Sequence, residues 1–123
     1  MKLAVKKLSQ LLSAGLDVPV FEHTLPDGYD EACVVVAEVS FDASTSEGAY
    51  TIRTYAPNKP RTVGEITDNS CPDMDTLEAV SDQVFALMED LWDTGFNGWL
   101  HTRQLVSEGI MHYFNISLTI QFD

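Results

Sequence analysis

The clearest pattern in the chain is an alternation of apolar and polar residues over its last segment. A period of two predicts a β-strand with one buried face and one face in solvent. A strand is also predicted over residues 98–106, joined to the last strand by a tight turn at residues 107–109. The predicted buried face of the last strand holds Ile110, His112, Phe114, Ile116, Leu118, Ile120 and Phe122.

Two segments carry apolar residues at helical spacing instead. Residues 3–14 predict a first helix that ends at Gly15. The second helix is predicted to open with a capping box formed by Asp75 and Glu78, and to end at Gly95. Its predicted buried stripe consists of Leu77, Val80, Val84, Leu87, Met88 and Leu91.

Three further strands are expected between the helices. Residues 18–23 predict a short strand, and the nearly continuous apolar run at 32–39 predicts a central strand covered on both faces. A third strand at 49–55 would pair with it through a seven-residue polar tip at 42–48. The segment 57–75 shows little periodicity and is expected to be a long irregular loop, of the kind that is often functional.

These elements define an α+β fold in the order α-β-β-β-α-β-β. Short connections favour antiparallel pairing of consecutive strands, so we expect one mainly antiparallel sheet of four to five strands. Both helices should pack on one face of that sheet. With no repeat or linker in the sequence, residues 1–123 are expected to form a single domain.

Charge narrows the classes of function. The chain has 19 acidic and 7 basic residues and a net charge of −12, which disfavours binding to nucleic-acid phosphates. No Lys or Arg occurs from Thr62 to Thr102, where nine carboxylates lie, so part of the surface should be strongly negative. No apolar run is long enough to span a membrane. The two cysteines, Cys33 and Cys71, are too few for a disulfide scaffold and favour a reducing compartment.

Motifs for catalysis or metal binding are not recognised in the sequence. The three histidines lack a metal-ligand spacing, and His112 is expected to be buried with satisfied ring nitrogens, with His101 as its cross-strand neighbour. Asp68, Asp73 and Asp75 are better explained by helix capping and a solvated loop than by a cation site. We therefore expect no catalytic residue, no metal and no cofactor, and we expect that the protein is not an enzyme.

A resemblance to a known family comes from the order of the elements. A first helix is followed by the strand VPVF, the hairpin ACVVVAEV…GAYTIRTY, the helix TLEAVSDQVFALMEDL and the closing hairpin GWLHTRQLVSEGIMHYFNISLTIQF. Over nearly the whole chain this order resembles the tail terminator (tail completion, or minor tail) proteins of long-tailed bacteriophages. The resemblance lies in element order, length and the closing amphipathic strand.

The resemblance implies a small protomer that forms a homo-oligomeric ring, commonly a hexamer, which caps the tail tube and joins it to the head. It implies other phage tail or head-completion proteins as partners. From the charge and the lack of a long apolar run, we expect no direct contact with nucleic acid or membrane. The expected location is the host cytoplasm during assembly and then the virion tail.

The candidate interface residues come from our own reasoning about the two polar loops and an aromatic cluster. Long polar loops can become ordered on assembly. Trp92, Phe96 and Trp99 form either a hydrophobic cap on the core or a contact patch for a partner. The candidate residues are Asp42, Ser44, Thr45, Ser46, Glu47, Lys59, Arg61, Glu65, Asp68 and Trp99.

Two other classes of function stay open at this point. The first is an acidic mimic of DNA that inhibits a nucleic-acid-binding protein, which would place carboxylates along one face at a spacing like that of phosphates. The second is a small-ligand-binding or enzymatic α+β domain, which would hold a pocket between the helices and the sheet.

Overall fold

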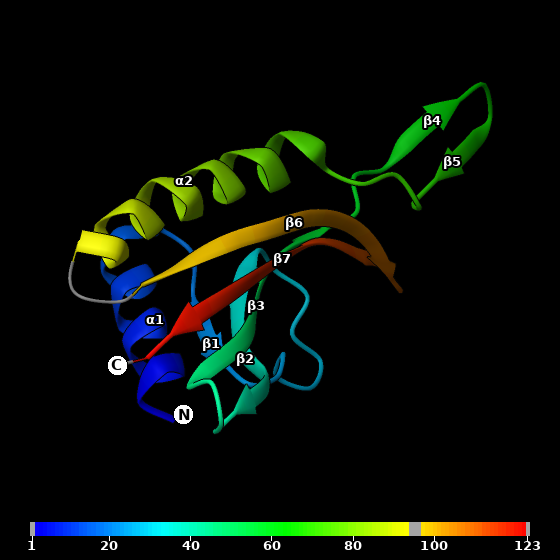
Figure 1. Ribbon diagram of the computed structural model, residues 1–123. Helices are drawn as coiled ribbons and strands as arrows, with labels where there is room; N and C mark the ends of the chain where they lie inside the picture. Colours follow the sequence, from blue (N-terminus) through cyan, green and yellow to red (C-terminus); the bar gives the residue numbers. More distant parts are fainter. Residues whose placement is uncertain (1, 94–96, 123) are drawn as a thin grey trace.

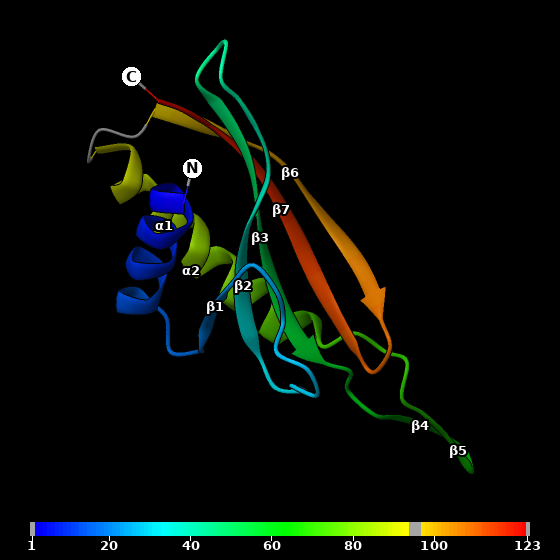
Figure 2. The same ribbon diagram turned by 90° about the horizontal axis from the view of Figure 1, so that it is seen from below.

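The computed structural model describes residues 2–93 and 97–122, and its core is a five-stranded sheet with two helices on one face (Figures 1 and 2). The sheet has the order β1-β2-β3-β7-β6, and two short strands, β4 and β5, form a separate two-stranded sheet. The predicted α+β fold with a mainly antiparallel sheet is confirmed. The elements are α1 (Lys2–Gly15), β1 (Val20–Glu22), β2 (Cys33–Asp42), β3 (Glu47–Pro57), β4 (Arg61–Val63), β5 (Ile66–Asp68), α2 (Met74–Asp93), β6 (Asn97–Glu108) and β7 (Met111–Gln121).

The main core lies between the helices and the sheet. Alternate residues of β2, β3 and β7 point toward the helices, because side chains along a strand change face at every position. They meet the apolar stripes of α1 and α2, and most of these side chains are fully buried. The core contains Ala4, Val5, Leu8, Leu12, Val34, Val36, Tyr50, Ile52, Val80, Val84, Met88, Ile116, Leu118 and Ile120.

The residue that caps helix α2 lies two positions before Asp75, the predicted cap. Asp73 caps it: Thr76 donates to both carboxylate oxygens of Asp73, from its backbone N at 3.3 Å and from its hydroxyl at 2.8 Å. Asp75 instead lies inside the first turn. Leu77 is buried as predicted, whereas the side chain of Leu91 and residue Gly95 lie outside the described part of the chain. No described helix is long and apolar enough to cross a membrane.

A second, smaller core lies on the other face of the sheet. Cys33, Val35, Tyr55 and Met111 are buried there, against Phe21, Leu25, Tyr29 and Tyr113. This explains the continuous apolar run at the start of β2, since both faces of that stretch are covered. The predicted alternation in the last strand is wrong at its beginning: Met111 is buried, and Ile110 lies in the turn with 64% of its surface exposed.

The first strand pairs in parallel with β2, which corrects the expectation of antiparallel pairing. Val20 lies opposite Val34, and Glu22 lies opposite Val36. The connection at residues 23–32 is long enough to cross the second face and return to the end of the sheet at which β1 begins. It also supplies Leu25 and Tyr29 to the smaller core. The parallel direction of β1 and β2 is therefore linked to the packing of this connection.

The tip between β2 and β3 is shorter than predicted. Asp42 pairs with Glu47, so the tip contains only residues 43–46 and not seven residues. The Asp42 carboxylate accepts hydrogen bonds from the backbone N of Ser44 at 2.9 Å and from its hydroxyl at 2.7 Å. These bonds close the turn and lower the pKa of the Asp42 carboxyl, with the Ser44 hydroxyl as the largest cause.

Candidate functional site

A hairpin arm, residues 58–71, projects from the end of the sheet (Figures 1 and 2). Its strands β4 and β5 pair antiparallel, with Val63 opposite Ile66. Gly64 occupies a positive φ of 62°, which a two-residue turn of this kind requires at its first position. The predicted irregular loop at 57–75 is thus wrong for this part of the segment. Its three-residue strands are too short and too exposed to carry a periodic signal.

The end of the arm is apolar and exposed. Val63 has 66% and Ile66 has 72% of its surface in solvent. Single exposed apolar residues are common on protein surfaces, but here two exposed, branched side chains face each other across a projecting hairpin. Such a pair is suited to burial against a partner. Sequence reasoning missed both residues because it weighted the polar ones.

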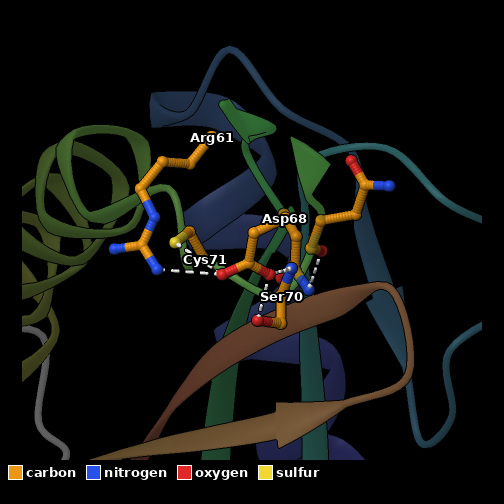
Figure 3. Close-up of polar contacts among 6 residues, drawn as sticks. Arg61, Asp68, Ser70 and Cys71 are labelled. Carbon is orange, nitrogen blue, oxygen red and sulfur yellow. Dashed lines mark hydrogen bonds and ion pairs between the residues drawn. The ribbon is translucent and has the colours of Figure 1, made fainter. Parts of the chain in front are cut away.

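Charged side chains stiffen the middle of the arm (Figure 3). Arg61 Nη2 donates to Asp68 Oδ2 at 2.9 Å, and Ser70 donates to Asp68 Oδ1 from both its backbone N and its hydroxyl. Hydrogen bonds from Ser70 first, and then from Arg61, lower the pKa of Asp68 to about 2. Asp68 is therefore a charged residue that closes the arm on itself. In the described ranges, no group of three or more His, Cys, Asp or Glu residues could hold a metal ion.

The base of the arm is fixed to the sheet by Asn58. Its backbone N donates to Ile110 O at 2.8 Å, its Nδ2 donates to Asn69 O at 3.0 Å, and its Oδ1 accepts from His112 Nδ1 at 2.6 Å. Lys59 N also donates to Cys71 O at 2.9 Å, which joins the two ends of the arm. His112 is buried, with 9% of its surface exposed, as predicted. The arm is thus held where the turn between β6 and β7 begins.

The predicted pairing of His101 with His112 is wrong. The partner of His112 across β6 is Ser107. His101 lies where the register of β6 shifts, and its Nε2 is 2.6 Å from Thr119 Oγ1. Sequence reasoning could not place it, because a bulge changes which residues face each other.

An apolar cavity of about 340 Å³ lies on the face opposite the helices, close to the base of the arm. Its charged lining residues, Asp30 and Glu108, are both acidic. Burial is the largest cause that raises the pKa of Tyr29 and Tyr55, so both phenols stay neutral. The sequence had suggested that a pocket, if present, would lie between helices and sheet. The lining residues are Leu25, Gly28, Tyr29, Asp30, Tyr55, Glu108, Gly109, Ile110 and Met111.

The predicted interface residues fall into two groups at opposite ends of β3. The first group lies at the tip between β2 and β3 and contains Asp42, Ser44, Thr45, Ser46 and Glu47; the second lies on the arm and contains Lys59, Arg61, Glu65 and Asp68. Strand β3 runs from Glu47 to Pro57, so the groups are separated by roughly 35 Å.

Trp99 belongs to the end of the sheet that carries the tip. It pairs with Thr119, which lies beside Ala49 of β3, and 46% of its surface is exposed. Its ring makes an edge contact with His101 at 5.8 Å between centroids. Phe96 and the side chain of Trp92 lie outside the described part of the chain, so the predicted aromatic cluster is described only at Trp99.

In comparisons with known proteins, neither a protein-family model nor a curated protein sequence matches the chain.

Proposed function

We propose that this chain is a structural subunit of a phage or prophage tail, which forms a ring that caps the tail tube or joins it to the head. The observation that carries the proposal is the projecting hairpin arm with its exposed apolar tip. An arm of this kind is suited to contact between subunits, because Val63 and Ile66 at its tip would be buried by contact with another molecule.

The distribution of the candidate surfaces supports a ring. A ring closes through heterologous contacts, in which one surface of a subunit meets a different surface of the next. The arm and the tip between β2 and β3 are different surfaces at opposite ends of β3. Subunits with two such surfaces can be joined in a closed series.

An open strand edge adds a second route for contact. Of the described strands, β6 is the last one on its side of the sheet, and most of its residues are exposed. Unpaired edges are a template for pairing with another chain.

The charge of the chain sets the conditions for the test. Copies with a net charge of −12 repel one another, and salt screens this repulsion. We expect light scattering to show a species several times the 13.7 kDa chain mass, increasingly populated as protein concentration and ionic strength rise. The same species should appear as a ring by negative-stain electron microscopy. A monomer under all of these conditions would refute the proposal.

A second candidate function, an acidic mimic of DNA, is supported by one feature of α2. Asp75, Glu78, Asp82 and Glu89 are exposed and recur at helical spacing, so they form one stripe of carboxylates along the helix. A mimic acts as a monomer and competes with DNA for a basic protein. Competition binding with labelled duplex DNA and a DNA-binding protein distinguishes the two functions. A mimic displaces the DNA from that protein, whereas a ring subunit leaves the DNA bound.

A further inference from the structure

We propose that the apolar tip of the hairpin arm, Val63 and Ile66, inserts into the cavity of a second copy of this chain. The inference rests on the proposed function, because it names the contact through which the subunits join. It assigns the cavity a protein ligand, and it assigns the arm a defined receptor.

The arm cannot fill the cavity of its own chain. Asn58 N is bonded to Ile110 O, and Ile110 lines the cavity, so the base of the arm lies at the cavity rim. From Asn58 to Gly64 the arm extends by six residues, or roughly 20 Å when extended. The Arg61–Asp68 ion pair and the β4–β5 pairing keep it extended. Its tip is therefore carried away from its own cavity, and a cavity that receives it must belong to another copy.

The two surfaces match in polarity and shape. The tip presents the apolar pair Val63 and Ile66, beside the exposed Glu65 of the turn. The cavity is concave and walled largely by apolar or aromatic side chains, among them Leu25, Tyr55 and Met111. The cavity has a volume of about 340 Å³, which falls in the range of pockets that enclose small-molecule ligands. This volume is sufficient for two aliphatic side chains.

Charge favours the arm as the occupant. The arm carries two basic residues, Lys59 and Arg61, and two acidic ones, Glu65 and Asp68, so it is neutral in a chain of net charge −12. The charged residues that line the cavity, Asp30 and Glu108, are acidic. The arm as a whole is therefore repelled less by this rim than the acidic remainder of a copy would be, because Lys59 and Arg61 offset the charges of Glu65 and Asp68.

Disulfide trapping between two singly substituted proteins tests the contact. In a Cys71→Ser background, Ile66→Cys on one copy is mixed with Ile110→Cys on a second, size-tagged copy and oxidised with oxidised glutathione. Cys33 is fully buried and stays in place. The matched control replaces Ile110→Cys by Val39→Cys. Both residues are 64% exposed, but Ile110 lines the cavity, whereas Val39 lies in β2 toward the opposite end of the sheet.

We expect the mixed disulfide with Ile110→Cys and at least several-fold less with Val39→Cys. Equal yields, or a higher yield with Val39→Cys, would overturn the inference. As a second measurement, Ile66→Ser should weaken self-association by about tenfold, and Val39→Ser should not. Val39, Ile66 and Ile110 are exposed, so these three substitutions should leave the fold intact.

Light scattering on the same samples separates this inference from the proposed function. A ring-sized mass without the Ile66–Ile110 cross-link overturns the arm contact and leaves the ring. The cross-link in a species that never exceeds a dimer supports the arm contact, as a two-fold exchange of arms, and overturns the ring. A monomer without cross-link at every concentration overturns both.

Discussion

Substituting Asn58 by alanine should destabilise the fold by about 2 kcal/mol. The change removes two side-chain hydrogen bonds, one to Asn69 O at 3.0 Å and one to His112 Nδ1 at 2.6 Å. Each bond of this kind contributes about 1 kcal/mol, and a buried partner left without its acceptor adds to the loss. Because His112 belongs to β7, an inner strand of the main sheet, part of the loss should appear in global unfolding.

Urea unfolding followed by circular dichroism measures the global effect, and hydrogen exchange of the arm amides measures the local one. A loss of about 2 kcal/mol at the base corresponds to roughly 30-fold faster exchange in the arm. The matched control is Asn69→Ala: Asn69 is exposed and uses its backbone carbonyl in this contact, so its loss should stay within about 0.5 kcal/mol.

A double-mutant cycle with His112→Ala tests whether the effect runs through the pair. We expect a coupling energy of about 1 kcal/mol between positions 58 and 112. The reasoning is refuted if Asn58→Ala matches Asn69→Ala in both assays, or if the two substitutions at 58 and 112 are additive.

Three further outcomes follow from the structure. Gly48→Ala should destabilise the fold by about 1–3 kcal/mol in urea unfolding, since the new Cβ would lie 2.5 Å from Cε2 of the buried Tyr50; an unchanged midpoint contradicts the crowding. The Asp68 carboxyl should titrate by NMR near pH 2, below its usual 3.8, so its stabilising effect on the arm is complete above about pH 4 and is lost as the pH falls through about 2; a midpoint near 4 contradicts this. Burial raises the pKa of Cys33 to about 12, so a thiol reagent at pH 8 should modify Cys71 alone in the folded protein and both cysteines in denaturant; labelling of Cys33 in the folded state contradicts the burial.

Elements whose residues alternate between core and solvent could be predicted from the sequence. In helix α1 and strand β7, buried and exposed residues alternate regularly over many positions, so the sequence pattern identifies each element clearly. Strands β4 and β5 have no buried face, and hence no pattern. The sequence did contain one signal for this hairpin, the two-residue turn Gly64-Glu65 between the apolar residues Val63 and Ile66.

The candidate site was only partly predictable, for a related reason. Arg61 and Asp68 were chosen as partner-binding residues, but they bind each other across the arm. The cavity is built from three separate segments, the connection at 23–32, the end of β3 and the turn between β6 and β7, and no local pattern links them. Its location depends on the path of that connection over the sheet, which follows from tertiary packing and not from periodicity.

The placement of β3 has a mechanical consequence. This strand carries the arm at one end and the tip between β2 and β3 at the other, and it is bonded along nearly its whole length to β2 on one side and to β7 on the other. A pull applied between these two ends would load both ladders in shear, so that many hydrogen bonds must break together and not one after another. Tension between the arm and this tip would therefore run along a strand that neighbours hold on both sides.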